Sequence, residues 1–469
     1  MKLLRLWIIT IILIFLTSCN SNTDKAQNDE VVDKPLPSIS IIADSQESLA
    51  LFKQEEKNIE KKFGVSIEYH YSDRLNDNLE DFLFASNKTY DIYMIFPAKI
   101  PDYVERDMLL PLDTFIENTE EIEDILPVKF KGHDYGMVYD GDTHLLFYRK
   151  DIFEKYKDEY KKLYGKSLEP PQTWDEYDQI AKFLTLDTDA DGLIDLYGTA
   201  IFGGEAKRYI WFAERFLSMG GTYFDEQMNP MIDNELGIKA LQDLVQLNDS
   251  RATPPDSMYD WIDLNHSFLQ GQLAMVIQWS DTSRFSFDQK NWNSQIENQV
   301  GWTLVPAQDP KNPRGGVWIG RVLGISKKSN NPEKSWEVIS YITSKAVSKK
   351  ALASKDTIND PFRYNHFSSI GKGAFPTAEM NNDFLNTVKL SLQNPNADLM
   401  ISGGWEYMQI LDRNIYLALI HKATPEEALQ KTAKEWNLLT DQYGREEQAQ
   451  DHKEWLNLLE EIKNHEMEK

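Results

Sequence analysis

One short stretch of this chain places oxygen ligands at the spacing of a cation-binding loop. Acidic residues fill positions 1, 3, 5 and 9 of an EF-hand-like pattern, glycine fills position 6, and position 12 is Gly198 instead of the usual glutamate. Four acids crowded together repel one another without a cation, so we expect a structural Ca²⁺ here. The alternative is an acidic turn closed by hydrogen bonds to Asp side chains. The expected ligands are the side chains of Asp187, Asp189, Asp191 and Asp195 and the carbonyl of Leu193.

No motif for bond-making chemistry is present in the sequence. The patterns HExxH, CxxC, GxGxxG and GxSxG are all absent. Gly165-Lys166-Ser167 lacks the glycine that a phosphate-binding loop places five residues before its Gly-Lys pair. We therefore expect neither catalysis nor ATP hydrolysis from this chain, and no required cofactor.

The only cysteine, Cys19, lies behind a basic start and an apolar run over 6–16. This run is shorter than the about 20 residues of a membrane-spanning helix, and the pattern is that of a secretory signal. Leu-Thr-Ser-Cys at 16–19 resembles a bacterial lipobox, which implies cleavage before Cys19 and a lipid on its sulfur. An ordinary signal peptide or a membrane anchor is the alternative. We expect 1–18 to be a lipoprotein signal peptide and the polar segment 19–37 to be a flexible tether outside the cytoplasmic membrane.

The charge of the chain limits its partners. Removal of 1–18 takes away Lys2 and Arg5 and no acid, which changes the formal net charge from −25 to −27. Such a chain repels nucleic acid and has no basic patch for anionic lipid. A hydrophobic content of 41% is enough for a large core, and a single cysteine allows no internal disulfide.

The periodicity of the sequence predicts an α/β fold. Segments 39–42, 65–71 and 90–96 read as strands, and 49–63 and 75–85 as helices. Strands that alternate with helices indicate βαβ units and mostly parallel sheets. Ligands of such sheets bind beyond the carboxyl ends of the strands, which here points to residues 96–99.

Later segments give the chain a family resemblance from about 38 to about 439. The marks are Tyr-Arg-Lys-Asp-Ile-Phe at 148–153, a strand at 271–279, a glycine-rich segment at 315–326 followed by Asn-Pro-Glu at 331–333, and a capped helix within 423–436. In this order they resemble the extracellular solute-binding proteins of bacterial ABC importers that take up sugars and oligosaccharides.

The resemblance implies the two-lobed periplasmic-binding-protein fold, with hinge crossovers and a ligand cleft. By analogy, 38–143 with 277–345 would form the N-terminal lobe and 144–276 with 346–440 the C-terminal lobe, followed by a helical extension over 441–469. The implied partners are a carbohydrate and the transmembrane permease subunits, with contact to the membrane through the lipid alone. We expect a monomer.

Carbohydrate recognition needs aromatic faces and polar side chains. Trp211, Trp336 and Trp436 lie at apolar positions of predicted helices, which favours core packing. The resemblance favours Trp279, at a strand end, and Trp405, after two glycines, as cleft residues. We also expect ligand contacts from Trp318, Asp142, Asp281 and Arg321.

Two other functions remain compatible with the sequence. Carboxylates near tryptophans would suit a secreted glycan hydrolase, whose acid pair lies about 5–10 Å apart. A ligand sensor for a membrane kinase or chemoreceptor is the other. The resemblance favours a lipid-anchored receptor that delivers sugar to a permease.

Overall fold

A computed structural model describes residues 36–77, 82–83, 88–117, 128–255, 259–309, 311, 315–318, 320–367, 373–394 and 396–464. The elements below belong to one unit, Pro37–Lys469. The predicted signal peptide, Cys19 and the tether up to residue 35 lie outside the described residues.

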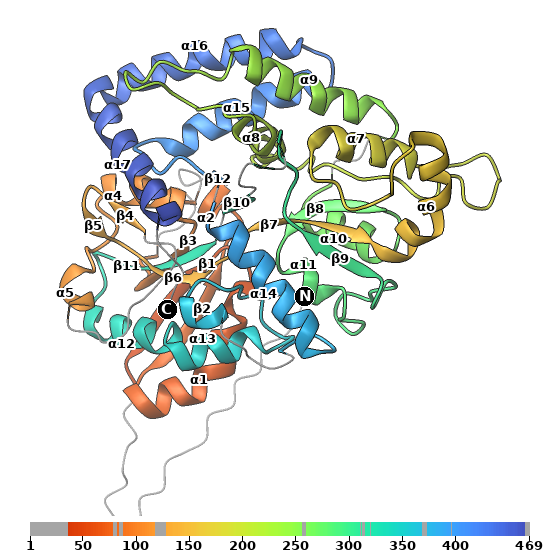
Figure 1. Cartoon of the computed structure of the whole chain (residues 1–469). Coiled ribbons are helices and arrows are strands. Elements are labelled where there is room, and N and C mark those ends of the chain that lie inside the picture. Colours follow the sequence, from red (N-terminus) through yellow and green to blue (C-terminus); the bar gives the residue numbers. More distant parts are fainter. Residues whose placement is uncertain are drawn as a thin grey trace, which may run out of the picture. The chain divides into compact units, whose positions relative to one another are not determined.

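The first of two main sheets has five strands in the order β2-β1-β3-β11-β6 (Figure 1). β1 is parallel to β2 and β3, whereas β11 is antiparallel to β3 and β6. Its strands are β1 (Ser38–Ala43), β2 (Ser66–Tyr71), β3 (Ile92–Ile95), β6 (Met137–Asp140) and β11 (Arg321–Ile325).

Helices α1, α12 and α13 cover one face of this sheet. Phe52 and Ile59 of α1 and Trp336 of α12 pack in one core cluster with Ile39 and Ile41 of β1. α1 ends at Gly64, whose φ of 65° lies in the left-handed region that glycine adopts without strain. The elements around this sheet are η1 (Glu47–Leu49), α1 (Ala50–Phe63), α2 (Arg74–Asp77), η2 (Pro97–Lys99), α4 (Ile100–Glu105), α5 (Asp113–Ile116), β4 (Lys129–Phe130), β5 (His133–Asp134), α12 (Pro332–Ile342) and α13 (Lys345–Leu352).

The second sheet has the order β8-β7-β9, and both of its strand pairs are antiparallel. Its strands are β7 (His144–Arg149), β8 (Met275–Trp279) and β9 (Val300–Thr303). The predicted α/β class is confirmed, but the main sheets are not mostly parallel. The first sheet is mixed, with parallel pairs between β1 and its two neighbours, and the second sheet is antiparallel.

Helices supply the rest of the core. Capping boxes at Thr173 and Thr424 begin α7 and α16, as their sequence patterns predict. In Figure 1, α9, α15 and α16 lie together. The remaining elements are α6 (Lys150–Tyr164), α7 (Trp174–Phe183), α8 (Tyr209–Ser218), α9 (Glu235–Asp249), α10 (Trp261–Leu269), α11 (Thr282–Phe285), β10 (Val317–Trp318), η3 (Tyr364–Phe367), α14 (Ala378–Leu392), β12 (Asn396–Ala397), α15 (Gly404–Leu419), α16 (Pro425–Tyr443) and α17 (Arg445–Asn464).

The chain passes between the two sheets at places that differ from the expected boundaries. It leaves the first sheet between β6 and β7, close to the expected residue 143. Residues 277–303 do not join the first sheet, because β8 and β9 both pair with β7. The chain returns to the first sheet between β9 and β11. Residues 346–352 lie with the first sheet, since Val347 and Ala351 of α13 pack in its cluster.

The C-terminal extension is a helix, α17, with one face packed on the fold. Trp455, Leu458 and Ile462 are buried along it. Gln448 donates a hydrogen bond to the carbonyl of Ser402 at 2.9 Å. The predicted charged helix therefore contributes to the core as well as to the surface.

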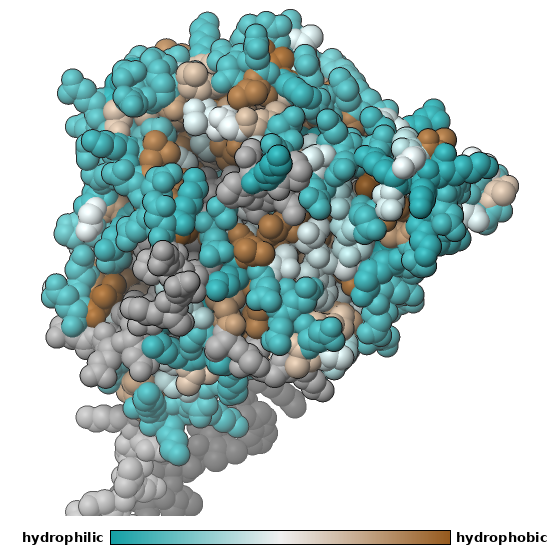
Figure 2. Space-filling model, viewed as in Figure 1, coloured by the Kyte–Doolittle hydropathy of each residue, from teal (hydrophilic) through white to brown (hydrophobic). Residues whose placement is uncertain are grey.

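The face of the molecule in Figure 2 is largely polar. Figure 2 shows mostly hydrophilic residues on the face in view, with hydrophobic ones scattered between them. Within the described ranges, the helices are all too short or too polar to cross a membrane.

Candidate ligand-binding site

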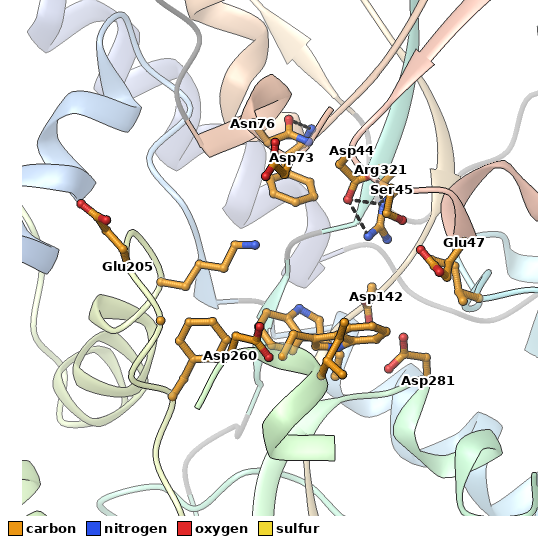
Figure 3. Close-up of a pocket in the computed structure, with 18 residues that line it drawn as sticks. Asp44, Ser45, Glu47, Asp73, Asn76, Asp142, Glu205, Asp260, Asp281 and Arg321 are labelled. Carbon is orange, nitrogen blue, oxygen red and sulfur yellow. Dashed lines mark hydrogen bonds and ion pairs between the residues drawn. The ribbon is translucent and has the colours of Figure 1, made fainter. Parts of the chain in front are cut away.

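A cavity of about 370 Å³ is lined by residues that follow strands of both sheets (Figure 3). Asp44 and Phe96 follow β1 and β3 of the first sheet, and Trp279 ends β8 of the second. Its volume is at the lower end of the range for small-molecule pockets. The lining residues are Asp44, Ser45, Glu47, Asp73, Asn76, Phe96, Asp142, Phe202, Gly204, Glu205, Lys207, Asp260, Trp261, Ile262, Trp279, Asp281, Arg321 and Ile358.

Trp279 is the central aromatic residue of this site. All five residues of β8 are buried, and the register places Trp279 opposite His144 of β7. The ring centroids of these two residues are 4.4 Å apart, edge to face, and Trp211 and Phe202 each lie 6.3 Å from Trp279. Because its neighbours fix the indole, it presents a rigid apolar surface to the cavity.

A second aromatic group lies at the start of α10. Trp261 is the first residue of this helix, which Asp260 caps by accepting the N–H of Asp263 at 2.9 Å. Its ring lies edge to face with Phe285 at 5.9 Å and with Trp292 at 5.5 Å. The cap therefore holds a carboxylate and an aromatic ring side by side at the cavity.

Two buried carboxylates, Asp142 and Asp281, lie at the cavity near Trp279. They are 6% and 2% exposed. Oδ1 of Asp142 accepts a hydrogen bond from Ser280 at 3.3 Å, whereas Oδ1 of Asp281 is buried with no hydrogen-bond partner. Burial raises the pKa of both carboxyl groups well above the usual value. The second largest cause also raises the pKa: it is the charge of Asp281 for Asp142, and the charge of Asp360 for Asp281.

Arg321 joins two segments of the first sheet and reaches the cavity. Its Nε and Nη2 donate to Asp44 at 3.0 and 2.9 Å, and its Nη1 donates to Asp140 at 2.7 Å. The fork of a guanidinium is suited to such bidentate pairing. Burial raises the pKa of Asp140 to about 6, although Arg321 acts in the opposite direction.

The segments that connect the two sheets are tied together by buried polar contacts. Asp360 accepts from Arg284 at 2.7 Å and from the Ser280 hydroxyl, and its backbone N–H donates to Asp140 at 2.7 Å. A Cβ at Gly141 would lie 2.0 Å from the carbonyl oxygen of Pro361, so only glycine permits this approach. The crossover at 140–142 and the segment at 360–361 are thereby held against each other.

The structure brings together four of the six predicted ligand residues: Asp142, Trp279, Asp281 and Arg321 all line the cavity. Trp405 does not line it. Its ring lies 3.2 Å from the Nζ of the fully buried Lys99, and Trp405 itself is 6% exposed. For Trp318 only the backbone, in β10, lies within the described part of the chain.

Most of the residues that the first sheet contributes to the site were not predicted from the sequence. The rule that ligands bind beyond strand ends, applied to residues 96–99, applies equally to Asp44 and Ser45 after β1. Asp260 and Trp261 carried a recognisable capping box with Asp263. Phe202 and Lys207 come from a loop without such a signal.

The acidic loop lies apart from this cavity. Carboxylate oxygens of Asp187, Asp189 and Asp195 lie within 4.8 Å of one another, and all three residues are exposed. Asp191 instead accepts the N–H of Leu193 at 2.8 Å. These Asx contacts belong to the alternative reading of the loop, and the Ca²⁺ site stays a prediction.

If this loop binds Ca²⁺, the ion will stabilise the folded state by an amount that grows with the logarithm of its concentration above the Kd. At about 100 times its Kd, a ligand adds about 2.7 kcal/mol to the free energy of unfolding. We expect a higher Tm in CaCl₂ than in EDTA, and a smaller difference for Asp189→Asn. Equal melting temperatures of the wild-type protein in both solutions would count against the site.

Curated relatives match part of the chain. A probable amino-acid ABC transporter periplasmic-binding protein of Sinorhizobium fredii is 23% identical over 276 residues, 57% of this chain and 57% of that protein. A putative binding protein of Brucella abortus is 23% identical over 266 residues, 54% of this chain and 58% of that protein. The chain thus spans little more than half the length of these relatives.

Solved structures share the fold over most of the chain. Maltose-bound MalE3 of T. maritima aligns with a TM-score of 0.70 at 23% identity, over 86% of this chain and 99% of that one. A ribitol complex of an Agrobacterium radiobacter K84 solute-binding protein gives 0.71 at 20% identity, over 87% and 100%. The GacH receptor of Streptomyces glaucescens, studied with acarbose, gives 0.71 at 18% identity, over 87% and 99%. These likenesses confirm the predicted two-lobed binding-protein fold.

A family model completes the comparison. Residues 43–349, well over half of the chain, match the model described as bacterial extracellular solute-binding protein. The matched region includes the second sheet, the first sheet apart from most of β1, and every residue that lines the cavity except Ile358. The chain therefore belongs to the family of bacterial extracellular solute-binding proteins.

Proposed function

We propose that this protein is the substrate-binding component of an ABC importer and captures a sugar or polyol in the cavity between its two sheets. The observation that carries this proposal is the cavity itself, where Trp279 lies beside Asp142, Asp281 and Arg321. Aromatic rings suit the apolar C–H faces of a sugar ring, and carboxylates and guanidinium groups suit its hydroxyls. Relatives of the same fold are described with maltose, ribitol and acarbose.

Capture would depend on relative movement of the two sheets about their connections. Binding proteins of this type close around a ligand by hinge bending. Here Arg321 is already oriented by Asp44 and Asp140, so a ligand would not have to order its side chain. In this proposal the protein changes its conformation and leaves the ligand chemically unchanged.

We further propose that a lipid on Cys19 holds the protein at the outer side of the membrane, near the permease subunits that receive the ligand. The family is extracellular, and the Leu-Thr-Ser-Cys sequence is the basis for the anchor. A tethered receptor meets its permease at a higher effective concentration than a free one.

Thermal-shift screening followed by calorimetry tests the carbohydrate proposal. The panel contains neutral monosaccharides, disaccharides, polyols and amino sugars, with L-amino acids as the counter-panel suggested by the Sinorhizobium fredii relative. We expect at least one carbohydrate to raise the Tm, because ligand binding to the folded state stabilises it. Stabilisation by amino acids alone would refute the proposal, and release of smaller sugars from an oligosaccharide would identify a hydrolase.

A further inference from the structure

The cavity has a strong excess of negative charge. Seven carboxylate side chains line it, against two cationic ones, Lys207 and Arg321. Of the seven, Asp142 and Asp281 are buried, and Asp44 is paired with Arg321. The other four are exposed: Glu47, Asp73, Glu205 and Asp260.

The cationic side chains do not offset this excess. Arg321 is shared between Asp44, at 2.9 Å, and Asp140, which does not line the cavity, at 2.7 Å. Lys207 has its Nζ 5.6 Å from the centroid of the Phe96 ring. Even with Asp142 and Asp281 both protonated, the remaining acids in the lining outnumber the two cations.

Asp281 shows where a ligand would meet this charge. It is 2% exposed, its Oδ1 has no hydrogen-bond partner, and Figure 3 shows its carboxylate directed toward the rings drawn beside it. Arg284, the guanidinium that lowers the pKa of Asp281 most, donates to Asp360 at 2.7 Å. A buried carboxylate oxygen without a donor costs free energy, and a ligand that supplies a donor recovers it.

The charged environment favours a cationic donor over a hydroxyl. Burial raises the pKa of Asp281 most, and the charges of Asp360 and Asp140 raise it further. Burial likewise raises the pKa of Asp142, and the charge of Asp281 is the second cause. Arg284 and Arg321 act in the opposite direction on Asp281 but only in part. A ligand hydroxyl would donate a hydrogen bond to Oδ1 of Asp281 but would leave the repulsion between the neighbouring carboxylates. An ammonium group would donate the same hydrogen bond and would also offset their negative charge.

The arrangement of these acids fits an organic cation better than a bare metal ion. In the residues that the structure describes, the group that brings three ligand atoms within 4.8 Å of one another is the distant Asp187 loop. Among the described residues, no three acids of the cavity lining bring their oxygens this close, and the lining also contains Trp279 and Trp261. An aromatic ring next to a carboxylate is a favourable site for an ammonium group.

We propose that the carbohydrate bound here carries a positively charged amino group, which is held by Asp281 and Asp142 next to Trp279. This inference rests on the proposed carbohydrate capture and specifies its ligand class. It assigns Asp281 as the residue that distinguishes an amino sugar from its neutral counterpart.

Calorimetry with matched ligand pairs tests the inference. The first probes are glucosamine and galactosamine, and their neutral partners are glucose and galactose. The second probes are glucosamine oligomers of two to four units, and their neutral partners are the N-acetylated oligomers and the cellulose-derived oligomers of the same length. We expect at least one amine-bearing probe to bind at least tenfold more tightly than its neutral partner. Asp281→Asn should remove most of this ratio.

Matched variants separate the charge of Asp281 from general effects. Asp243→Asn makes the same charge change on α9, outside the cavity, where Asp243 pairs with Lys239 at 2.6 Å. It should leave the ratio unchanged. Asp142→Asn provides a second cavity variant if Asp281→Asn does not fold, and it should also lower the ratio.

The outcomes distinguish this inference from the proposed function. Equal or tighter binding of every neutral partner would overturn the amino-group inference while carbohydrate capture stands. A ratio that survives both Asp281→Asn and Asp142→Asn would overturn the assignment of these residues. If no carbohydrate of any kind binds, the proposed function fails, and this inference fails with it.

Discussion

Trp279→Ala is expected to weaken carbohydrate binding by at least about 30-fold, whereas Trp405→Ala leaves the affinity nearly unchanged. A buried aromatic anchor in a binding site contributes about 2 kcal/mol or more. Trp279 lines the cavity and Trp405 does not. The two residues are 5% and 6% exposed, so Trp405 is a control of equal burial.

Both substitutions are also expected to lower the stability of the fold, so the affinities are compared only between variants that remain folded. Loss of a buried tryptophan side chain costs about 3–5 kcal/mol. Trp279→Ala would leave an unfilled space next to the rings of His144 and Trp211. Calorimetry on variants whose far-UV circular dichroism shows folded protein measures the affinities. A comparable loss of affinity in both variants would contradict the assignment of Trp279.

Arg284→Ala is expected to destabilise the protein by about 3–5 kcal/mol, because it leaves a buried carboxylate uncompensated. Arg284 and Asp360 are 4% and 1% exposed in their side chains and are 2.7 Å apart. Lys239→Ala, which removes an exposed partner of Asp243, is the control and should cost less than about 1 kcal/mol. Urea unfolding of the three proteins measures the difference.

The loss caused by Arg284→Ala should depend on pH. Burial raises the pKa of Asp360 in the folded protein above its value in the unfolded chain. The folded protein therefore holds the proton of this carboxyl group more tightly, and it loses stability as the pH rises from the unfolded pKa to the folded one. Without Arg284 the charged form is penalised further. The difference from wild type should be smaller near pH 4.5 than near pH 7.5, and Arg284→Ala/Asp360→Asn should recover part of the loss. A pH-independent difference would show that Asp360 is not its cause.

The elements were predictable from sequence because their signals are local. β1, α1 and β2 follow from alternation, helical periodicity and a terminal glycine. The partners of β8 and β9 were not predictable, since strand pairing depends on contacts far apart in the chain. Analogy assigned residues 277–303 to the N-terminal lobe, whereas β8 and β9 pair with β7 of the second sheet.

The site was predictable to the extent that one strand end or one turn carried its residues. Trp279 is the last residue of the buried strand β8, and Asp281 follows two residues later. Asp142 lies at a glycine turn. Trp405 follows two glycines in the same way but packs in the core over Lys99. A glycine next to a tryptophan indicates close packing of the backbone, and it does not specify which side of the chain faces solvent.

The acidic lining of the cavity belongs to a chain whose net charge is −25, so the local and the overall electric fields have the same sign. For a cationic ligand both fields accelerate association, and for a sugar acid both slow it. Salt shortens the range of these fields to about 10 Å at 0.1 M ionic strength. The rate of ligand capture would therefore follow the salinity of the surroundings, while the contacts inside the closed cavity would depend on it much less.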